Sequence, residues 1–251
     1  MINSDNFSLD KKNIDTILVL DFGSQYTQLI ARRIRELNVF SEILPWDISV
    51  DRIKSLNPKG VILSGGPESV TESNTPRIPK TIFELEVPVL GICYGMQTLA
   101  EQFGGQVTSS KNKEFGHAKI FIESASLLFD GFISGSSVDV WMSHGDHVST
   151  LPDEFNLIAS TSSAPIAGME HSKKPIYALQ FHPEVTHTKQ GNIILENFTH
   201  KICKCSAQWK IENLIEQRID EIKGKVGDQK VLLGLSGGVD SSVTAMLLDR
   251  S

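Results

Sequence analysis

The sequence predicts an α/β fold with a mixed, mostly parallel sheet flanked by helices, followed by an incomplete second α/β domain. Short apolar runs that end in glycine-rich turns alternate with segments whose apolar residues recur at helical spacing, as in βαβ units. Near residue 205 the pattern changes: a charged helix comes first, and the alternation of strand and helix then starts again. We therefore expect a flexible leader over residues 1–15, a complete domain over 16–205, and the beginning of another domain over 206–251.

In the first domain, short apolar runs bounded by turn residues are predicted to be strands. The first run, residues 17–20, is followed by a helix over 24–37, with Ser24 as its expected cap. The half from 104 to 185 is richer in short runs and is expected to add antiparallel strands. The remaining expected elements are strands at 41–45, 60–63, 87–92, 119–122, 138–142, 156–160, 166–169 and 177–181, and helices at 94–103 and 192–199.

The second domain is expected to begin with a helix over 209–222 and a strand over Val231–Leu235. The loop Ser236–Ser242 and the start of another helix follow. A piece of this size cannot bury an independent core, so we expect it to be mobile or prone to association. On this interpretation the chain ends inside a two-domain protein.

Composition limits the function. Among 251 residues, Lys and Arg total 24 and Asp and Glu total 30, for a net charge of −6, which argues against binding to nucleic acid or an anionic membrane. No apolar run approaches the roughly 20 residues of a membrane span. Three cysteines are too few for a disulfide framework, and the polar N-terminus lacks a signal-peptide core. We therefore expect a cytoplasmic enzyme.

The segment Gly91–Gly95, where a predicted strand meets a predicted helix, carries a candidate nucleophile, Cys93. G-x-C-x-G copies the geometry of the G-x-S-x-G elbow, and a helix N-terminus favours the reactive thiolate. The alternative is an inert buried cysteine.

A candidate base is His182, which lies two residues before Glu184. In an extended segment both side chains point the same way, so the carboxylate can orient the imidazole and the imidazole can serve a thiolate. A plain surface strand is the alternative for this pair.

Two glycine-rich turns complete the pattern. Ser64-Gly65-Gly66-Pro67 ends a predicted strand, and its backbone N–H groups can approach a developing oxyanion, although it could also be an ordinary turn. The loop Ser236–Ser242 follows a predicted strand and opens a helix, so its amides and hydroxyls suit a phosphate group. Its alternative is a flexible linker. The members of this loop are Ser236, Gly237, Gly238, Val239, Asp240, Ser241 and Ser242.

The segments 63–67, 91–97 and 181–184 resemble the three motifs of class I, triad-type glutamine amidotransferases, whose fold is flavodoxin-like. The resemblance implies that Cys93 attacks the side-chain amide of glutamine, with His182 as acid and base and Glu184 orienting it. It further implies that the N–H groups of Gly66 and Tyr94 bind the oxyanion and that Gln97 holds the substrate. No metal or cofactor is implied for this half.

Residues 21–26 and 141–146 resemble a branch of this family that carries a synthetase domain, and the loop 236–242 is similar to that of N-type ATP pyrophosphatases. In that branch ATP and Mg²⁺ activate xanthosine monophosphate, which ammonia then aminates, and the complete protein is expected to be a homodimer. Two alternatives stay open: an amidotransferase subunit serving another synthetase, and a catalytically silent regulatory homologue. The pair Cys203 and Cys205 lacks the partner ligands of a zinc site.

Overall fold

The computed structural model describes residues 14–251, so the predicted leader lies outside the described residues except for its last two positions. The chain divides into two compact units, Met1–Ala207 and Gln208–Ser251, which are described separately.

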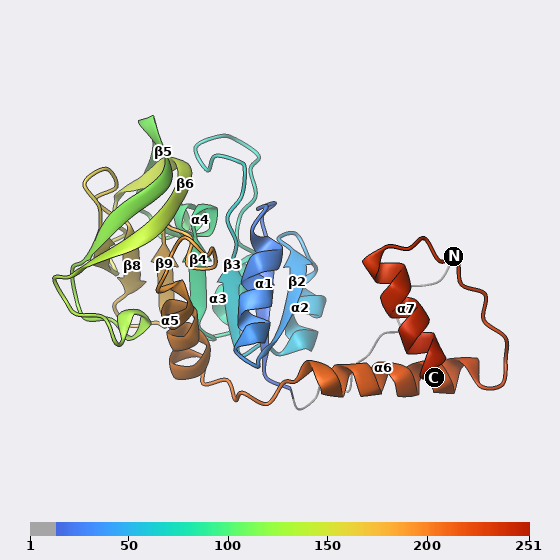
Figure 1. The fold of residues 1–251 in the computed structure, drawn as a ribbon. Helices are drawn as coiled ribbons and strands as arrows, with labels where there is room; N and C mark the ends of the chain where they lie inside the picture. Colours follow the sequence, from blue (N-terminus) through green and yellow to red (C-terminus); the bar gives the residue numbers. More distant parts are fainter. Residues whose placement is uncertain (1–13) are drawn as a thin grey trace. The chain divides into compact units, whose positions relative to one another are not determined.

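The first unit is built on one nine-stranded sheet in the order β2-β1-β3-β4-β9-β8-β7-β5-β6 (Figure 1). The strands β2, β1, β3, β4 and β9 run parallel to one another, and β9, β8, β7, β5 and β6 pair antiparallel. This confirms the mixed sheet. The strands are β1 (Thr16–Asp21), β2 (Phe40–Pro45), β3 (Gly60–Leu63), β4 (Val89–Ile92), β5 (Gln106–Ile122), β6 (Ser137–Thr150), β7 (Phe155–Ser160), β8 (Gly168–His171) and β9 (Ile176–Leu179).

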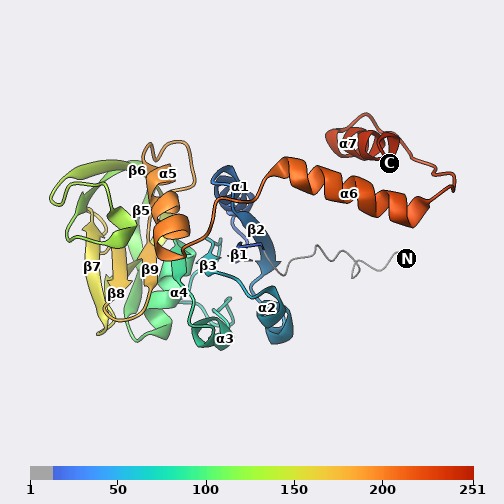
Figure 2. The ribbon, with the colours of Figure 1, turned by 90° about the horizontal axis from the view of Figure 1, so that it is seen from below.

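Helices cover both faces of the parallel half, which explains its continuous apolar strands. Ile17 and Val19 of β1 face a core that includes α1 and α5, while Leu18 and Leu20 face a core that includes α2, α3 and α4. Figure 2 shows α1 and α5 on one side of the sheet and the other three on the opposite side. These helices are α1 (Thr27–Glu36), α2 (Val50–Leu56), α3 (Lys80–Glu84), α4 (Tyr94–Gln102) and α5 (Gly191–Glu196).

Three local predictions for this unit need correction. Helix α1 begins at Thr27 rather than at Ser24, and the Ser24 hydroxyl accepts a hydrogen bond from the Tyr26 N–H (3.1 Å) in the turn before it. The hairpin of β5 and β6 is much longer than the apolar runs that predicted it. Most of its residues are polar, so apolar runs alone did not reveal its full length. After α5 the chain continues as the π-helical segment Asn197–Ile202, where an α-helix was expected up to residue 199.

The second unit contains α6 (Ile211–Val226) and α7 (Val239–Asp249), as the spacing of apolar residues predicted. The predicted strand Val231–Leu235 is wrong for this structure, because the segment has no regular secondary structure. A strand is stabilised by hydrogen bonds to a neighbour, and the described part of this unit offers no strand to pair with. Within residues 14–251, no helix combines the length and apolar character needed to cross a bilayer.

Candidate active site

Cys93 lies at the sharp turn between β4 and α4. Its backbone has φ 53° and ψ −107°, a conformation that L-residues rarely adopt and that stores strain. The turn is tight because a Cβ on Gly95 would lie 2.5 Å from the Leu63 carbonyl oxygen, and one on Gly91 would lie 2.8 Å from Gly95. Only glycine allows strand and helix to approach this closely, so the two flanking glycines build the elbow that presents the sulfur.

His182 and Glu184 form a buried pair just after β9. The His182 Nδ1–H donates to Glu184 Oε1 at 2.7 Å, and the two side chains are 3% and 0% exposed. Burial lowers the pKa of the imidazole, but the Glu184 carboxylate and the contact with Cys93 outweigh it and hold this pKa well above its usual range. The pair is therefore arranged to keep a proton on His182.

The backbone around His182 is fixed by the neighbouring strand β6. The His182 N–H donates to the Trp141 carbonyl (3.0 Å), and the Thr188 hydroxyl donates to the His182 carbonyl (2.6 Å). Tyr26 meets the imidazole edge to face, with ring centroids 5.1 Å apart. These contacts leave His182 few alternative orientations.

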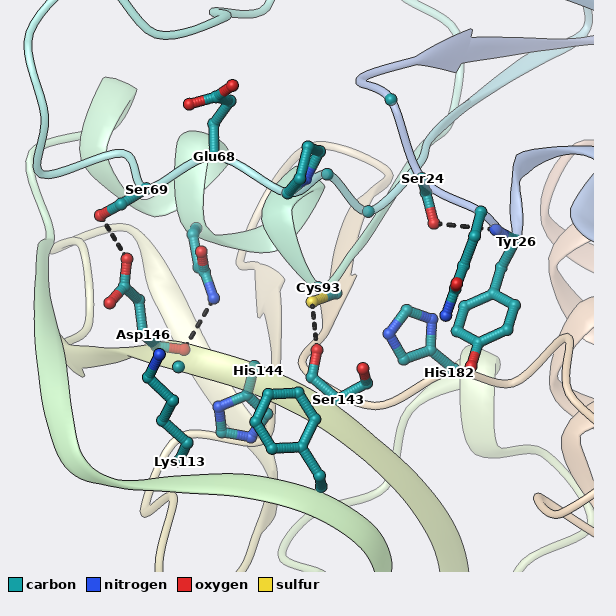
Figure 3. A pocket seen from close by; sticks show the side chains of 18 of the residues that line it. Ser24, Tyr26, Glu68, Ser69, Cys93, Lys113, Ser143, His144, Asp146 and His182 are labelled. Carbon is teal, nitrogen blue, oxygen red and sulfur yellow. Dashed lines mark hydrogen bonds between the residues drawn. The ribbon is translucent and has the colours of Figure 1, made fainter.

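A cavity of about 600 Å³ opens over these groups (Figure 3). Cys93 and His182 lie on its wall, and the Cys93 thiol donates to the Ser143 carbonyl at 3.5 Å. The wall also includes residues 23–26, 65–69, 72, 109, 113, 115 and 143–146. The carboxyl ends of β1, β3 and β4 meet here, where open α/β sheets bind ligands.

The turn after β3 borders the same space. A Cβ on Gly65 would lie 3.4 Å from His182 Cε1 and 3.6 Å from Cys93 Cβ, and one on Gly66 would clash with the Phe22 carbonyl at 2.7 Å. Among the described residues, the backbone N–H groups of Gly66 and Tyr94 donate to no acceptor. Two uncommitted donors beside the Cys93 sulfur suit an oxyanion.

Gln97, on the first turns of α4, is buried and lines the cavity. Its Nε2 donates to the Asp146 carbonyl at 2.7 Å and to Gln180 Oε1 at 3.5 Å. The Asp146 carboxylate in turn accepts from the hydroxyls of Ser69 and Ser109. Asp146 thereby links the turn after β3 with the hairpin of β5 and β6.

Gln180 is a residue that the motifs did not single out. It is completely buried, and its Nε2 donates to Cys93 Sγ at 3.8 Å. Gln180 lies two residues before His182 in the segment that follows β9, but a glutamine carries no reactive group, so no motif pointed to it.

A second histidine on the cavity wall behaves differently. His144 Nε2 lies 3.1 Å from Glu114 Oε2, and burial lowers the pKa of this imidazole despite the carboxylate. The Glu114 side chain is 23% exposed, so water weakens its effect. The pKa of His144 is thus shifted in the opposite direction to that of His182.

The loop of the second unit precedes α7 as the sequence predicted. Gly237 has φ 80°, and the Ser236 and Ser241 hydroxyls lie 3.1 Å apart. The Ser242 hydroxyl donates to the Gly238 carbonyl, and Asp240 lies in the first turn of the helix. The loop is thus closed on itself at a helix N-terminus.

Cys203 and Cys205 are both buried in the first unit. Burial raises the pKa of both thiols, that of Cys205 to about 12. No group of three or more metal-ligating side chains occurs in the described part of the chain. Their burial favours a packing role.

A sharp strand-to-helix elbow at the carboxyl edge of the parallel strands is typical of a class of α/β enzymes, and the chain belongs to one family within it, the class I glutamine amidotransferases. Residues 18–202 match the family described as "Glutamine amidotransferase class-I". Residues 210–251 match the family described as "NAD synthase".

Curated relatives of the chain carry the name glutamine-hydrolyzing GMP synthase. The chain is 54% identical over 248 residues to the protein of that name from Hamiltonella defensa, and the match covers 96% of this chain and 47% of the relative. With that of Teredinibacter turnerae it shares 57% over 244 residues, covering 94% and 46%. The chain therefore spans about half the length of these relatives.

A solved structure supports the same grouping. A Thermoplasma acidophilum protein described as one subunit of a GMP synthase matches with a TM-score of 0.66 and 34% identity, over 81% of this chain and 98% of that one. This similarity extends over nearly the whole of that protein, which has about the size of the first unit alone.

Proposed function

We propose that the first unit hydrolyses glutamine to glutamate and ammonia through Cys93, His182 and Glu184. The observation that carries this proposal is the buried 2.7 Å bond between His182 and Glu184 beside the strained Cys93, with Cys93 and His182 on the wall of one cavity. The Cys93 thiol passes its proton to His182 as the sulfur attacks the side-chain carbonyl carbon, and the oxyanion is held by the N–H groups of Gly66 and Tyr94. Gln97 borders the substrate.

Protons follow the same geometry. As the carbon–nitrogen bond breaks, His182 gives its proton to the leaving nitrogen, which departs as ammonia, and the acyl group stays on sulfur as a thioester. His182 then takes a proton from water as the water oxygen attacks the thioester carbon. The thiolate leaves and glutamate is formed, while Glu184 stabilises the imidazolium in each step.

The second unit is proposed to bind ATP as the first part of a synthetase domain, in which xanthosine monophosphate is converted to GMP. The match of residues 210–251 to the NAD synthase family and the names of the curated relatives support this. The loop Ser236–Ser242 would hold phosphate oxygens at the N-terminus of α7. Mg²⁺ prefers one or two carboxylates together with phosphate oxygens, and Asp240 supplies a carboxylate of that kind.

In the complete protein, direct transfer would keep ammonia unprotonated until it reacts with the activated nucleotide. We further propose that the complete protein is a cytoplasmic homodimer whose partners are glutamine, ATP and xanthosine monophosphate.

The test is glutamate release from glutamine by the purified chain. We expect release by the wild type, none by Cys93→Ala, and wild-type release by Cys205→Ala, which removes a buried thiol away from the cavity. The proposal fails if wild type and Cys93→Ala are equally inactive while folded and mixed with the synthetase portion of a relative.

A further inference from the structure

A buried amide lies directly behind the candidate nucleophile. Gln180 is 0% exposed and its backbone N–H is held by the Ala167 carbonyl at 2.9 Å, so the start of its side chain is fixed. Burying a primary amide is costly unless its donors and acceptor find partners. The partners that Gln180 has are Cys93 and Gln97, and both belong to the proposed glutaminase site.

The hydrogen-bond network determines which end of the amide meets the sulfur. The Gln97 Nε2 donates to Gln180 Oε1 at 3.5 Å, which fixes that oxygen as the acceptor. The Gln180 Nε2 is then left to face Cys93 Sγ at 3.8 Å. An N–H donor of this kind binds a thiolate more strongly than a thiol, because hydrogen bonds to charged acceptors are the stronger ones.

We propose that Gln180 is a positioning residue whose amide donates to the Cys93 sulfur, favours its thiolate form, and ties it to Gln97. The proposal deepens the proposed glutaminase function. Gln180 does not touch the substrate, since it is absent from the cavity wall and acts through the two residues that are on it.

Other titratable groups also face the sulfur's surroundings and have to be held constant in a test. His182 lies beside the sulfur, and the cavity wall carries Tyr26, Glu68, Glu72, Lys113, His144 and Asp146. None of these is changed by a substitution at position 180, so a shift in the pH profile of Cys93 chemistry between wild type and variant reports the lost amide.

The experiment measures alkylation of Cys93 by iodoacetamide as a function of pH in the full chain, with peptide mass spectrometry to separate Cys93 from Cys203 and Cys205. Because the thiolate is the reacting form, the rate follows its population. We expect the midpoint of the profile to rise by about one pH unit in Gln180→Met, or roughly tenfold slower alkylation at low pH, as for loss of a hydrogen bond to a charged group. Gln180→Asn, which withdraws the amide by one methylene, should move the midpoint in the same direction by less.

Asn197→Leu is the matched control. Asn197 is another buried amide, which donates to the Leu128 and Asp130 carbonyls away from the cavity. Its loss should lower stability without moving the alkylation midpoint. Glutamate release by Gln180→Met should fall near neutral pH and recover toward the wild-type rate as the pH rises.

An unchanged midpoint in both position-180 variants overturns the proposal, as does a glutamate-release defect that is the same at every pH. The alkylation readout does not require glutamine turnover. A chain that lacks glutaminase activity but shows the shift would therefore count against the proposed function and not against the role of Gln180.

Discussion

Replacing Glu184 by Gln removes the charge from the buried carboxylate but keeps its size and an acceptor for the His182 Nδ1–H. The bond is 2.7 Å long and the Glu184 side chain is fully buried, so water does not replace the lost charge. Two unit charges about 4 Å apart interact by about 4 kcal/mol at an effective dielectric constant of about 20. This interaction stabilises the imidazolium, and burial alone disfavours it.

The rate of glutamate release should therefore fall by up to roughly a thousandfold in Glu184→Gln, since each 1.4 kcal/mol or so is a factor of ten in rate. The fall should come from kcat, because Glu184 does not line the cavity. Imidazole NMR should show the pKa of His182 falling from its raised position, since burial then acts against a weaker partner.

Glu114→Gln is the matched control, because it neutralises the carboxylate beside the other cavity histidine. There the pKa of His144 should fall further while the titration of His182 stays as in the wild type. Wild-type glutamate release by folded Glu184→Gln, or a His182 titration that does not move, would refute the reasoning.

Three further predictions concern stability. Gly95→Ala should lower the free energy of unfolding by about 1–3 kcal/mol in thermal or urea denaturation, because its Cβ would lie 2.5 Å from the Leu63 oxygen. Gly224→Ala, in open space on α6, should leave the free energy of unfolding unchanged or raise it by up to about 1 kcal/mol. Equal effects of the two substitutions would contradict this prediction. Cys93→Gly should be more stable than Cys93→Ala, by about 1 kcal/mol, because glycine relieves the strain at φ 53°; the reverse order would argue against strain. Because the pKa of His144 is lowered in the folded chain, the unfolded chain protonates this imidazole first as the pH falls through about 6.5. On acidification the free energy of unfolding should therefore fall more in the wild type than in His144→Gln. Parallel profiles of urea midpoint against pH for the two proteins would contradict this prediction.

The elements that the sequence predicted well are those in which each residue reports its own environment. The strands of the parallel half are buried on both faces, so every residue from Ile17 to Leu20 had to be apolar and the run was visible. The same holds for the glycines around Cys93, where close approach excludes any side chain. Motif spacing was sufficient to pair His182 with Glu184, although the segment after β9 is a turn and not the extended segment that was expected.

What could not be predicted depends on a partner that is distant in sequence. The polar stretch of β5 becomes a strand because β6 pairs with it, for example Glu114 with His144, and neither stretch is apolar enough to show this alone. The segment 231–235 is the converse case: its apolar residues fit a strand, but a strand also needs a neighbour. Gln180 escaped notice because a glutamine carries no reactive group, and its importance lies in what it contacts.

The two cavity histidines differ in the surroundings of the carboxylate beside each imidazole. Each imidazole is nearly buried and lies within about 3 Å of a carboxylate, His182 at 2.7 Å and His144 at 3.1 Å. The pKa values nevertheless shift in opposite directions. At His182 the enclosed Glu184 and the contact with Cys93 outweigh burial, whereas at His144 burial outweighs the partly exposed Glu114 and His147 lowers the pKa further. These shifts favour a protonated imidazole at His182, beside the sulfur, and a neutral imidazole at His144, across the cavity. On the proposed function, His182 is the proton donor on the side where the bond between carbon and the leaving nitrogen breaks, and Glu184→Gln should weaken it.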